Sequence, residues 1–417
     1  MESSATRDEN GEHARTPRGN VPRDRRVDPL ALLTSEFDGV HDVWRSAAGT
    51  VCVAGPETAR AVMGNRHAAV AETSDFYRTR HGVFGPRAAQ IRIGRSARAL
   101  MRRHLDARRA ELPGLVAEHL APSSVWPDAG NLLVFRHLRD ALLHPEAPAQ
   151  LHATVEEIVN RSVLAGARRR HSPPSRLLFR RRALSTLHAE IRARQRDQRQ
   201  CAGPAEPRDL LDVVLDGNGD GTGDGSGETN GGGDLADPSE LAEVYLSFLF
   251  ASVGSIGFAL GWSLHLLGTH PGTPAAEPGW TVREALRLWP VAWLFARTPS
   301  RVQDLGGTTV TPRDQLAVCT YLVHRHPGHW ERPDEFVPQR WAAAAPDAAY
   351  LPFGLGPHTC AGATVTMRLL EDLIGLITRD WHLSVTSDGG GPHVGPALAP
   401  PRFTAVLSFR DGCPGGG

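Results

Sequence analysis

One cysteine stands inside a glycine-rich segment, Phe353-Gly-Leu-Gly-Pro-His-Thr-Cys-Ala-Gly362. The residues after it, 361–380, carry an amphipathic helical pattern, which places Cys360 at the first turn of a helix. The free N–H groups and the positive dipole end of a helix N-terminus favour a thiolate over a thiol. The surrounding glycines let the backbone pass close to a planar object. A thiolate presented in this way is suited to be the axial ligand of a haem iron.

This segment resembles the haem-ligand signature of the cytochrome P450 family, F-G-x-G-x-H/R-x-C-x-G, and fills every fixed position. The resemblance implies that Cys360 is the metal ligand, that Phe353 shields its sulfur and that His358 holds a haem propionate. Gly354 and Gly362 would belong to the same cofactor-binding segment. It also implies haem b as the cofactor, with a thiolate that pushes electron density to favour O–O cleavage.

A second motif lies upstream, where Glu284 and Arg287 are three residues apart on one predicted helix face. The later segment Pro338-Gln339-Arg340-Trp341 resembles the P-E-R-F segment of the same family, with Gln339 in place of the usual glutamate. The resemblance implies that Glu284, Arg287 and Arg340 form a buried network that supports the haem on its proximal side. Its role would be structural.

Two further propionate partners follow from the resemblance. Arg297, ten residues after Arg287, stands where the family often supplies one, the alternative being an ordinary exposed arginine on a strand. The other comes from an H/W-x-x-x-R pattern on an early helix. Arg98-x-x-x-Arg102 lacks the first residue of that pattern and points to Arg102, while His104-x-x-x-Arg108 fits the letters but starts later.

A long helix is predicted from about residue 238 to residue 267. Asp237-Pro238-Ser239-Glu240 supplies a capping residue, a proline at the first position and a glutamate at the third. The helix is apolar almost all round, so we expect it to be central and buried. Glycines in its middle weaken helicity by roughly 1 kcal/mol each and allow a kink or the close approach of something flat.

The middle of this helix departs from the family pattern. Ala251-Ser-Val-Gly-Ser255 aligns with A-G-x-D/E-T, whose acid and hydroxyl pass protons to bound oxygen. Gly254 replaces the acid, Ser255 the threonine and Ser252 the glycine. Ser255 keeps a hydroxyl that can donate and accept a hydrogen bond, and an ordered water could stand in for the acid. The alternative is that Ser255 bonds to the carbonyls of its own helix.

Composition sets the class of protein. The chain has 417 residues, a net charge of zero and 41% hydrophobic residues, enough for a sizeable core and without the basic bias of nucleic-acid binding. Every one of its 46 basic residues is arginine. Its five cysteines are scattered, which argues against a disulfide framework or a cysteine-held cluster. The polar start 1–28 lacks an apolar stretch, so we expect no signal peptide or membrane anchor and a cytoplasmic location.

The resemblance implies a mainly α fold with a small β portion, the haem lying between the central distal helix and the cysteine loop. We expect disordered tails at 1–28 and 411–417, and a single catalytic domain over 29–410. Within it, the Gly/Asp-rich stretch 216–236 is expected to be a flexible linker rather than a calcium loop. The chain pattern further indicates helices over 55–63 and 282–289, and a mainly helical region over 95–196 that is interrupted near Pro113, Pro122, Pro127, Pro145 and Pro173-Pro174. It also indicates a loop over 64–94, two short strands within 43–54, and strands over 294–301, 308–311 and 403–409.

The expected function is oxidation of a small organic, secondary-metabolite-like substrate by activated dioxygen. The resemblance to the soluble bacterial type implies electrons from a ferredoxin-type donor with its reductase, docked near Arg102, Arg103 or Arg368. Substrate contacts are expected from the loop 71–89, from residues 248–252, and from Val291 and Leu294.

Three alternatives remain. The altered distal motif also fits oxidative cross-linking of aromatic groups, with a peptide as one candidate substrate. A catalytically weak haem-binding relative that acts as a sensor or accessory protein is of another class. A zinc protein built on His358 and Cys360 is the most distant, since His-x-Cys supplies only two ligands.

Overall fold

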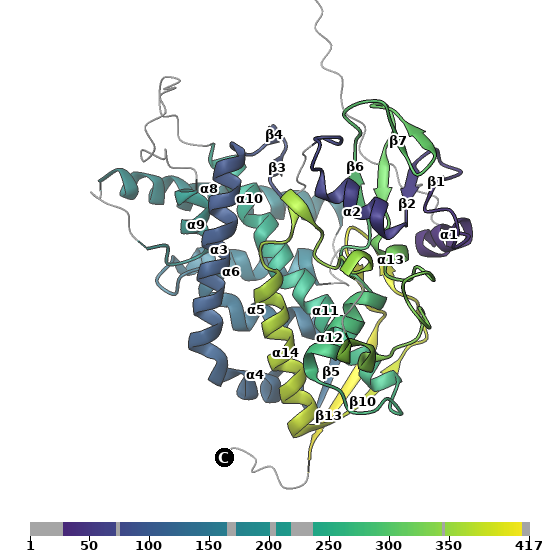
Figure 1. The fold of residues 1–417 in the computed structure, drawn as a ribbon. Coiled ribbons are helices and arrows are strands. Elements are labelled where there is room, and N and C mark those ends of the chain that lie inside the picture. Colours follow the sequence, from purple (N-terminus) through teal and green to yellow (C-terminus); the bar gives the residue numbers. More distant parts are fainter. Residues whose placement is uncertain are drawn as a thin grey trace, which may run out of the picture.

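Helices dominate the computed structural model, which describes residues 28–71, 76–164, 172–200, 206–217, 237–343 and 347–410 (Figure 1). The α-helices are α1 Pro29–Glu36, α2 Pro56–Gly64, α3 Arg87–Arg108, α4 Leu112–His119, α5 Asp128–Leu142, α6 Ala149–Ile158, α8 Pro173–Gln200, α9 Leu210–Asp216, α10 Pro238–Phe250, α11 Ile256–Thr269, α12 Pro278–Leu288, α13 Thr320–Val323 and α14 Ala363–Asp380. Short 3-10 or π turns are η1 Arg109–Glu111, η2 Val159–Val163, η3 Ala251–Ser255, η4 Pro338–Ala342, η5 Asp347–Ala349 and η6 Gly356–His358.

The strands form small sheets beside the helices. One sheet has the order β1-β2-β9-β6, from β1 Val43–Arg45, β2 Val51–Val53, β9 Leu316–Val318 and β6 Phe295–Arg297. A second has the order β10-β13-β5, from β10 Trp381–Ser387, β13 Phe403–Phe409 and β5 Ser123–Trp126. The remaining strands pair in hairpins: β3 Arg78–Thr79 with β4 Gly82–Val83, β7 Gln303–Leu305 with β8 Thr308–Val310, and β11 His393–Val394 with β12 Leu398–Ala399.

The mainly α expectation is confirmed, with several boundaries corrected. Helix α3 begins at Arg87, eight residues before the predicted start, because Pro86 can precede a helix and residues 89–94 already bury one face. Helix α9 continues to Asp216, so the predicted linker 216–236 starts too early; the rest of it, from 218, lies outside the described residues. Of the predicted tails 1–28 and 411–417, all but Asp28 also lie outside them; Asp28 caps α1 and so belongs to the folded part. Strands β5, β9 and β10 were not predicted, since short strands give weak periodic signals.

The central helix is interrupted where its glycines suggested. Asp237 caps α10 by accepting the N–H of Ser239 at 3.0 Å, as predicted. The α-helical pattern then gives way to one π turn, η3, and resumes as α11 to Thr269. This assembly passes a length-and-hydropathy test for a membrane span, but 61% of its most apolar window is buried inside the molecule. A π turn inside an α-helix frequently marks a functional site.

The central helix also organises the largest core. Helix α11 packs against α5, α12 and α14, and through its C-terminal half against β10. At one end of this core the rings of Trp126 and Phe403 stack at 5.5 Å, joining β5 to β13. Figure 1 shows α14 running alongside α3, with the antiparallel strands β10 and β13 below them. The haem-facing elements predicted from the sequence, the central helix and α14, are therefore neighbours in space.

Helix α5 contains a buried histidine, His137, that is 3% exposed. Neither of its ring nitrogens has a hydrogen-bond partner in the part of the chain that the structure describes. Burial, with a smaller effect of neighbouring His104, lowers the pKa of His137 from the usual 6.5 to about 4. The ring is therefore held in its neutral form.

We predict that this residue makes the protein acid-sensitive. Between pH 6.5 and pH 4 the unfolded chain binds a proton at His137 that the folded protein does not, so the stabilisation is complete above pH 6.5 and is lost as the pH falls. The loss at pH 5 should be on the order of 2 kcal/mol. Urea unfolding at pH 7.5 and pH 5 measures it, with His137→Met as the comparison. A variant whose unfolding free energy falls as steeply as that of the parent would contradict the assignment.

Candidate active site

The Cys360 loop is a tight backbone structure that leads into α14. The N–H of Cys360 donates to the carbonyl of Phe353 at 2.9 Å, and the N–H of Thr359 donates to that of Gly356 at 3.1 Å. Gly354 and Gly356 have φ of 69° and 71°, the left-handed region that favours glycine. At Gly356 a Cβ would lie 2.8 Å from Gly64 Cα, so the loop rests directly on the backbone at the end of α2.

The thiol of Cys360 lies just before α14. Gly362 caps this helix and Ala363 is its first residue, so the helix starts two residues later than predicted. The N–H of Ala363 donates to the carbonyl of Cys360 at 3.3 Å. The backbone N–H groups of Gly362 and Ala363 lower the pKa of the Cys360 thiol, but burial has the larger effect and raises that pKa in the protein alone.

Cys360 differs from the other described cysteines in its surroundings. Cys52 and Cys319 are buried, whereas Cys360 is exposed although protein atoms crowd its sulfur. No group of three or more His, Cys, Asp or Glu side chains in the described ranges is placed to hold a metal ion. Cys360 thus offers a single sulfur ligand, which fits a metal that brings its remaining ligands with it, as haem iron does. A zinc site on His358 and Cys360 lacks the further ligands it needs.

The structure brings Glu284, Arg287 and Arg340 together beneath this loop. Both oxygens of the fully buried Glu284 bind Arg287, at 2.8 and 2.9 Å, and one also accepts from Arg340 Nε at 3.0 Å. The same carboxylate accepts the indole N–H of Trp341 at 2.9 Å and the N–H of Val337 at 3.0 Å. Five donors on one carboxylate satisfy its lone pairs and compensate for the loss of water.

Arg287 extends the network to the irregular segment between α13 and the cysteine loop. Its remaining N–H groups donate to the carbonyls of His324, Pro333 and Glu335 at 2.6–3.0 Å. The guanidinium also lies 5.1 Å from the ring of Trp330. Arg287 therefore holds three points of a segment that has little regular structure of its own.

His324 connects this network to the cysteine loop and was not predicted. Burial, together with Arg287, lowers the pKa of His324 to about 3, so its ring is neutral. Its Nδ1–H then donates to the carbonyl of Arg287 at 3.2 Å, and its Nε2 accepts the N–H of Leu351 at 2.8 Å. Leu351 lies two residues before Phe353. The only sequence signal was a histidine in an apolar run, which occurs often in proteins without such a role.

On α3 it is Arg87, rather than Arg102, that reaches the loop. Gly94 touches the loop, since its Cβ would lie 3.3 Å from the Cβ of Ala361, and Arg87 stands two turns earlier on the same face. Its guanidinium donates to the carbonyl of Pro357, next to His358. Arg102 is exposed, and the haem contact proposed for it stays a prediction. Arg87 was missed because the helix was expected to begin at Arg95.

The second pattern on α3, His104-x-x-x-Arg108, makes its contacts away from the Cys360 loop. His104 Nε2 lies 2.6 Å from the carbonyl of His137 on α5, and Arg108 pairs with Glu111 and Asp140. The alternative His104-x-x-x-Arg108 reading therefore has no contact with the loop through these side chains.

Three other residues were predicted to contact the cofactor: Arg297, His358 and Phe353. Arg297 on β6 is buried, at 7% exposure, and donates to the carbonyl of Ala296 at 2.8 Å. The neighbouring Phe295 approaches the loop, 3.5 Å from where a Gly354 Cβ would be. His358 and Phe353 are half-buried. The structure thus excludes an ordinary exposed arginine at position 297, while its role as a propionate partner stays a prediction.

The distal residues lie in the π turn. Ser252 and Ser255 are half-buried, and Gly254 is buried with Val163 Cγ1 3.7 Å from its would-be Cβ. Ser247 and Ser263, in the flanking α-helical parts, bond to the carbonyl four residues back at 2.9 Å. Within the described residues Ser255 Oγ makes no such bond, so the back-bonding alternative is not what the structure has.

The predicted substrate region is partly assembled. Phe76 and Tyr77, from the loop 71–89, pack edge-on against Phe248 of the central helix at 4.9 and 6.1 Å; residues 72–75 of that loop lie outside the described part. Val291 belongs to the same apolar cluster as Phe248. Leu294 instead packs into the clusters beside the β1-β2-β9-β6 sheet.

Comparisons with known proteins agree with this geometry. The family model described as Cytochrome P450 matches residues 279–394, which hold the Glu284 network and the Cys360 loop. The structure superposes on a zebra fish cytochrome P450 with progesterone at a TM-score of 0.68 and 20% identity, covering 92% of this chain and 100% of the other. A mutant of P450 EryK in complex with erythromycin B gives 0.64 and 19%, covering 92% and 98%.

The chain is thus similar to the cytochrome P450 family over residues 279–394, and its fold is that of cytochrome P450 structures. Among curated relatives, the cyclooctatin synthase of Streptomyces melanosporofaciens is 32% identical over 36% of this chain and 39% of its own length. The cyclooctat-9-en-7-ol 5-monooxygenase of the same organism is 26% identical over 35% and 38%. The aligned part thus spans about two fifths of these relatives. In the P450 family the haem is held by a cysteine thiolate ligand.

The packing at Gly356 gives a prediction for this protein. Gly356→Ala should strain the positive φ and drive a methyl group into the backbone of Gly64, at a total cost of about 3 kcal/mol. Gly389→Ala is the matched control, because its φ is 75° but nothing lies within 4 Å of its would-be Cβ. We expect the control to lose only about 1 kcal/mol and to keep its haem. Chemical unfolding and haem content per chain measure both; equal losses in the two variants would contradict the close packing.

The Glu284 network gives a further testable prediction. Glu284→Gln should destabilise the protein by about 3–5 kcal/mol, because it leaves the buried Arg287 guanidinium without its counter-charge. The control is Glu118→Gln, whose side chain is 73% exposed and should change stability by no more than about 0.5 kcal/mol. Urea unfolding with the haem bound and removed is the measurement. A Glu284→Gln protein as stable as the parent would show that the carboxylate is not needed in its ionised form.

Proposed function

We propose that this protein is a cytochrome P450, a haem-thiolate monooxygenase that oxidises a small organic substrate of secondary-metabolite type with dioxygen. The observation that carries the proposal is the Cys360 loop: one sulfur just before the N-terminus of α14, and a buried frame that fixes its position. Bound there, a haem b would supply the oxygen-activating chemistry. Relatives named for steps on cyclooctatin-type compounds, and a structural neighbour that holds erythromycin B, support the substrate class.

Some of the chain's residues would position the cofactor, and others would donate or accept protons on the distal side. Cys360 would ligate the metal, while Phe353, Gly354 and Gly362 shape the loop beside the sulfur. His358 and Arg297 would hold acidic groups of the cofactor, with Arg87 as a further basic group near His358. On the distal side, the hydroxyl of Ser255 is available to donate or accept a proton, and the aromatic side chains around Phe248 would exclude water.

The proposal also includes the source of electrons and the location of the protein in the cell. A ferredoxin-type donor with its reductase, in the cytoplasm, fits the soluble bacterial members of the family. Of the arginines suggested for docking, Arg103 pairs with Glu206 at 2.9 Å and Arg368 pairs with Asp106, so each is partly neutralised. Arg102 keeps no described ion-pair partner, and docking at this face would depend mainly on it.

A second candidate is oxidative coupling of aromatic groups without oxygen insertion. It is favoured by the distal turn, where Gly254 stands in place of a proton-delivering acid. Mass spectrometry of the product distinguishes the two: gain of one oxygen atom supports the monooxygenase, and loss of two hydrogens supports coupling. If reductant consumption never responds to any substrate, a haem-binding sensor or accessory role is the better description.

Cys360→Ala tests the proposal directly. The variant should lose the thiolate-type spectrum of its reduced carbon monoxide complex, because no other described cysteine is exposed near the loop. Cys52→Ala, which changes a buried thiol in the β1-β2-β9-β6 sheet, is the control and should keep that spectrum. A parent protein that takes up no haem, or a thiolate-type spectrum that survives in Cys360→Ala, would overturn the assignment.

A further inference from the structure

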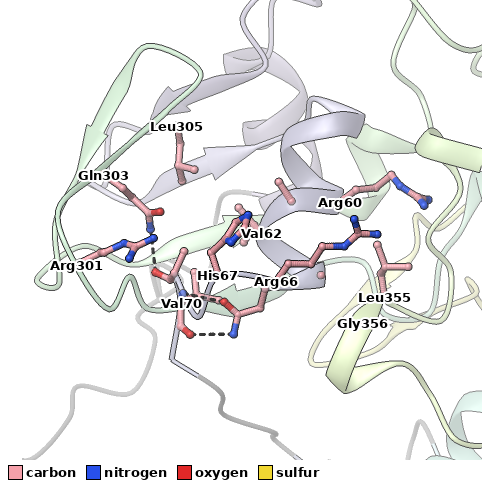
Figure 2. Close-up of a pocket in the computed structure, with 14 residues that line it drawn as sticks. Arg60, Val62, Arg66, His67, Val70, Arg301, Gln303, Leu305, Leu355 and Gly356 are labelled. Atoms are coloured by element: carbon pink, nitrogen blue, oxygen red, sulfur yellow. Dashed lines mark hydrogen bonds between the residues drawn. The ribbon is translucent and has the colours of Figure 1, made fainter.

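A second concave site lies on the outer side of the Cys360 loop. It is a pocket of about 550 Å³ between the end of α2, the strand β7 and the loop residues Leu355 and Gly356 (Figure 2). That volume falls within the roughly 300–1,000 Å³ typical of small-molecule sites. The pocket belongs neither to the Cys360 sulfur nor to the distal helix, since no residue of η3 or α14 lines it.

The lining of this pocket is cationic. Arg60, Arg66, His67 and Arg301 line it, and no aspartate or glutamate does. Arg66 and Arg301 form no ion pair or hydrogen bond with any residue in the described ranges, unlike Arg103 and Arg368 near the haem-ligand helix. Charges of one sign in a concave site reinforce one another and attract ions of the opposite sign.

The walls that carry these charges are held by hydrogen bonds. Asn65 ends α2 in the left-handed conformation and bonds to both backbone groups of Val70, at 3.0 and 3.1 Å. Gln303 on β7 donates to the carbonyl of Ala69 at 2.9 Å, tying the other wall to the same loop. A pocket whose backbone is fixed in this way needs little reorganisation to accept a ligand.

Helix electrostatics account for only part of the charge. Arg66 follows the C-terminal end of α2, where the helix dipole favours cations, whereas Arg60 lies in the middle of this helix. Arg301 comes from the segment before β7, and no helix end explains its position. Figure 2 shows Arg301 and Gln303 on one side of the pocket and Arg60, Arg66 and Leu355 on the other. The cations therefore face the pocket from two separate elements.

We propose that this pocket binds a small polyanion that carries two or more phosphate or carboxylate groups. Guanidinium groups on opposite sides match a ligand with an anionic group at each end, and bidentate hydrogen bonding to such groups is the chemistry that arginine does best. The binding site is distinct from the proposed oxidation site. Because Leu355 and Gly356 form one wall, an occupied pocket also touches the loop that ends at Cys360.

Isothermal titration of the haem-loaded full chain tests this, with inorganic pyrophosphate and citrate as separate probes and orthophosphate for comparison. We expect one site per chain and tighter binding of pyrophosphate or citrate than of orthophosphate. Whichever of the two binds tighter identifies the anionic group. Arg301→Gln and Arg66→Gln should each weaken binding about tenfold or more, because each removes a charge-assisted bond. Arg301→Lys should recover part of the loss.

The control is Arg402→Gln, which removes the same charge from a side chain that is 73% exposed and lies outside the pocket. Equal weakening by Arg402→Gln and Arg301→Gln would mean general attraction and would overturn the proposal. Binding seen only in the haem-free protein would overturn it too, because the arginines would then serve the cofactor. The same holds if an acidic peptide binds through Arg301 while neither small anion does, since the pocket would then be a protein docking surface.

Discussion

The carboxylate of Glu284 is the interaction on which the proximal half of this molecule depends. It is fully buried and accepts hydrogen bonds from Arg287, Arg340, Trp341 and the backbone of Val337. A buried charge of this kind is tolerated only when donors replace its water, and here those donors come from two segments, α12 and residues 337–341. The segments around residues 324–341 contain few regular elements. Hydrogen bonds to this carboxylate therefore hold them in place, as backbone hydrogen bonds do within a sheet or helix.

The frame reaches Cys360 through neutral polar contacts rather than further charges. His324 receives the N–H of Leu351, and the backbone of Phe353 accepts that of Cys360. On the other side, Gly356 rests against the end of α2, and Arg87 of α3 holds the carbonyl of Pro357. The cysteine is thus fixed from below by the buried ion network and from two sides by helices.

The sequence predicted the chemistry better than it predicted the geometry. The Cys360 segment, the Glu284 motif and the Asp237 helix start each depend on local residue types at fixed spacing, and local spacing survives folding. Arg87 and His324 were missed because their roles exist only through contacts with residues about 270 and 27 positions away. Strand β9 was missed for a similar reason, since Leu316–Val318 becomes a strand only by pairing with β2 and β6. The haem contact of Arg102 stays a prediction, because Arg102 is exposed on α3 and the contact depends on the cofactor.

The π turn of the central helix explains how a chain without a distal acid can still present a proton donor. In an α-helix a serine hydroxyl commonly bonds to the carbonyl four residues back, as Ser247 and Ser263 do here. A π turn shifts the backbone pattern to a spacing of five residues, so Ser255 sits out of register with the carbonyl that would otherwise capture its hydroxyl. The same turn places buried Gly254 beside Val163, where a carboxylate side chain would need a polar partner. The position that lacks the acid and the serine whose hydroxyl makes no bond to its own helix therefore lie in the same π turn.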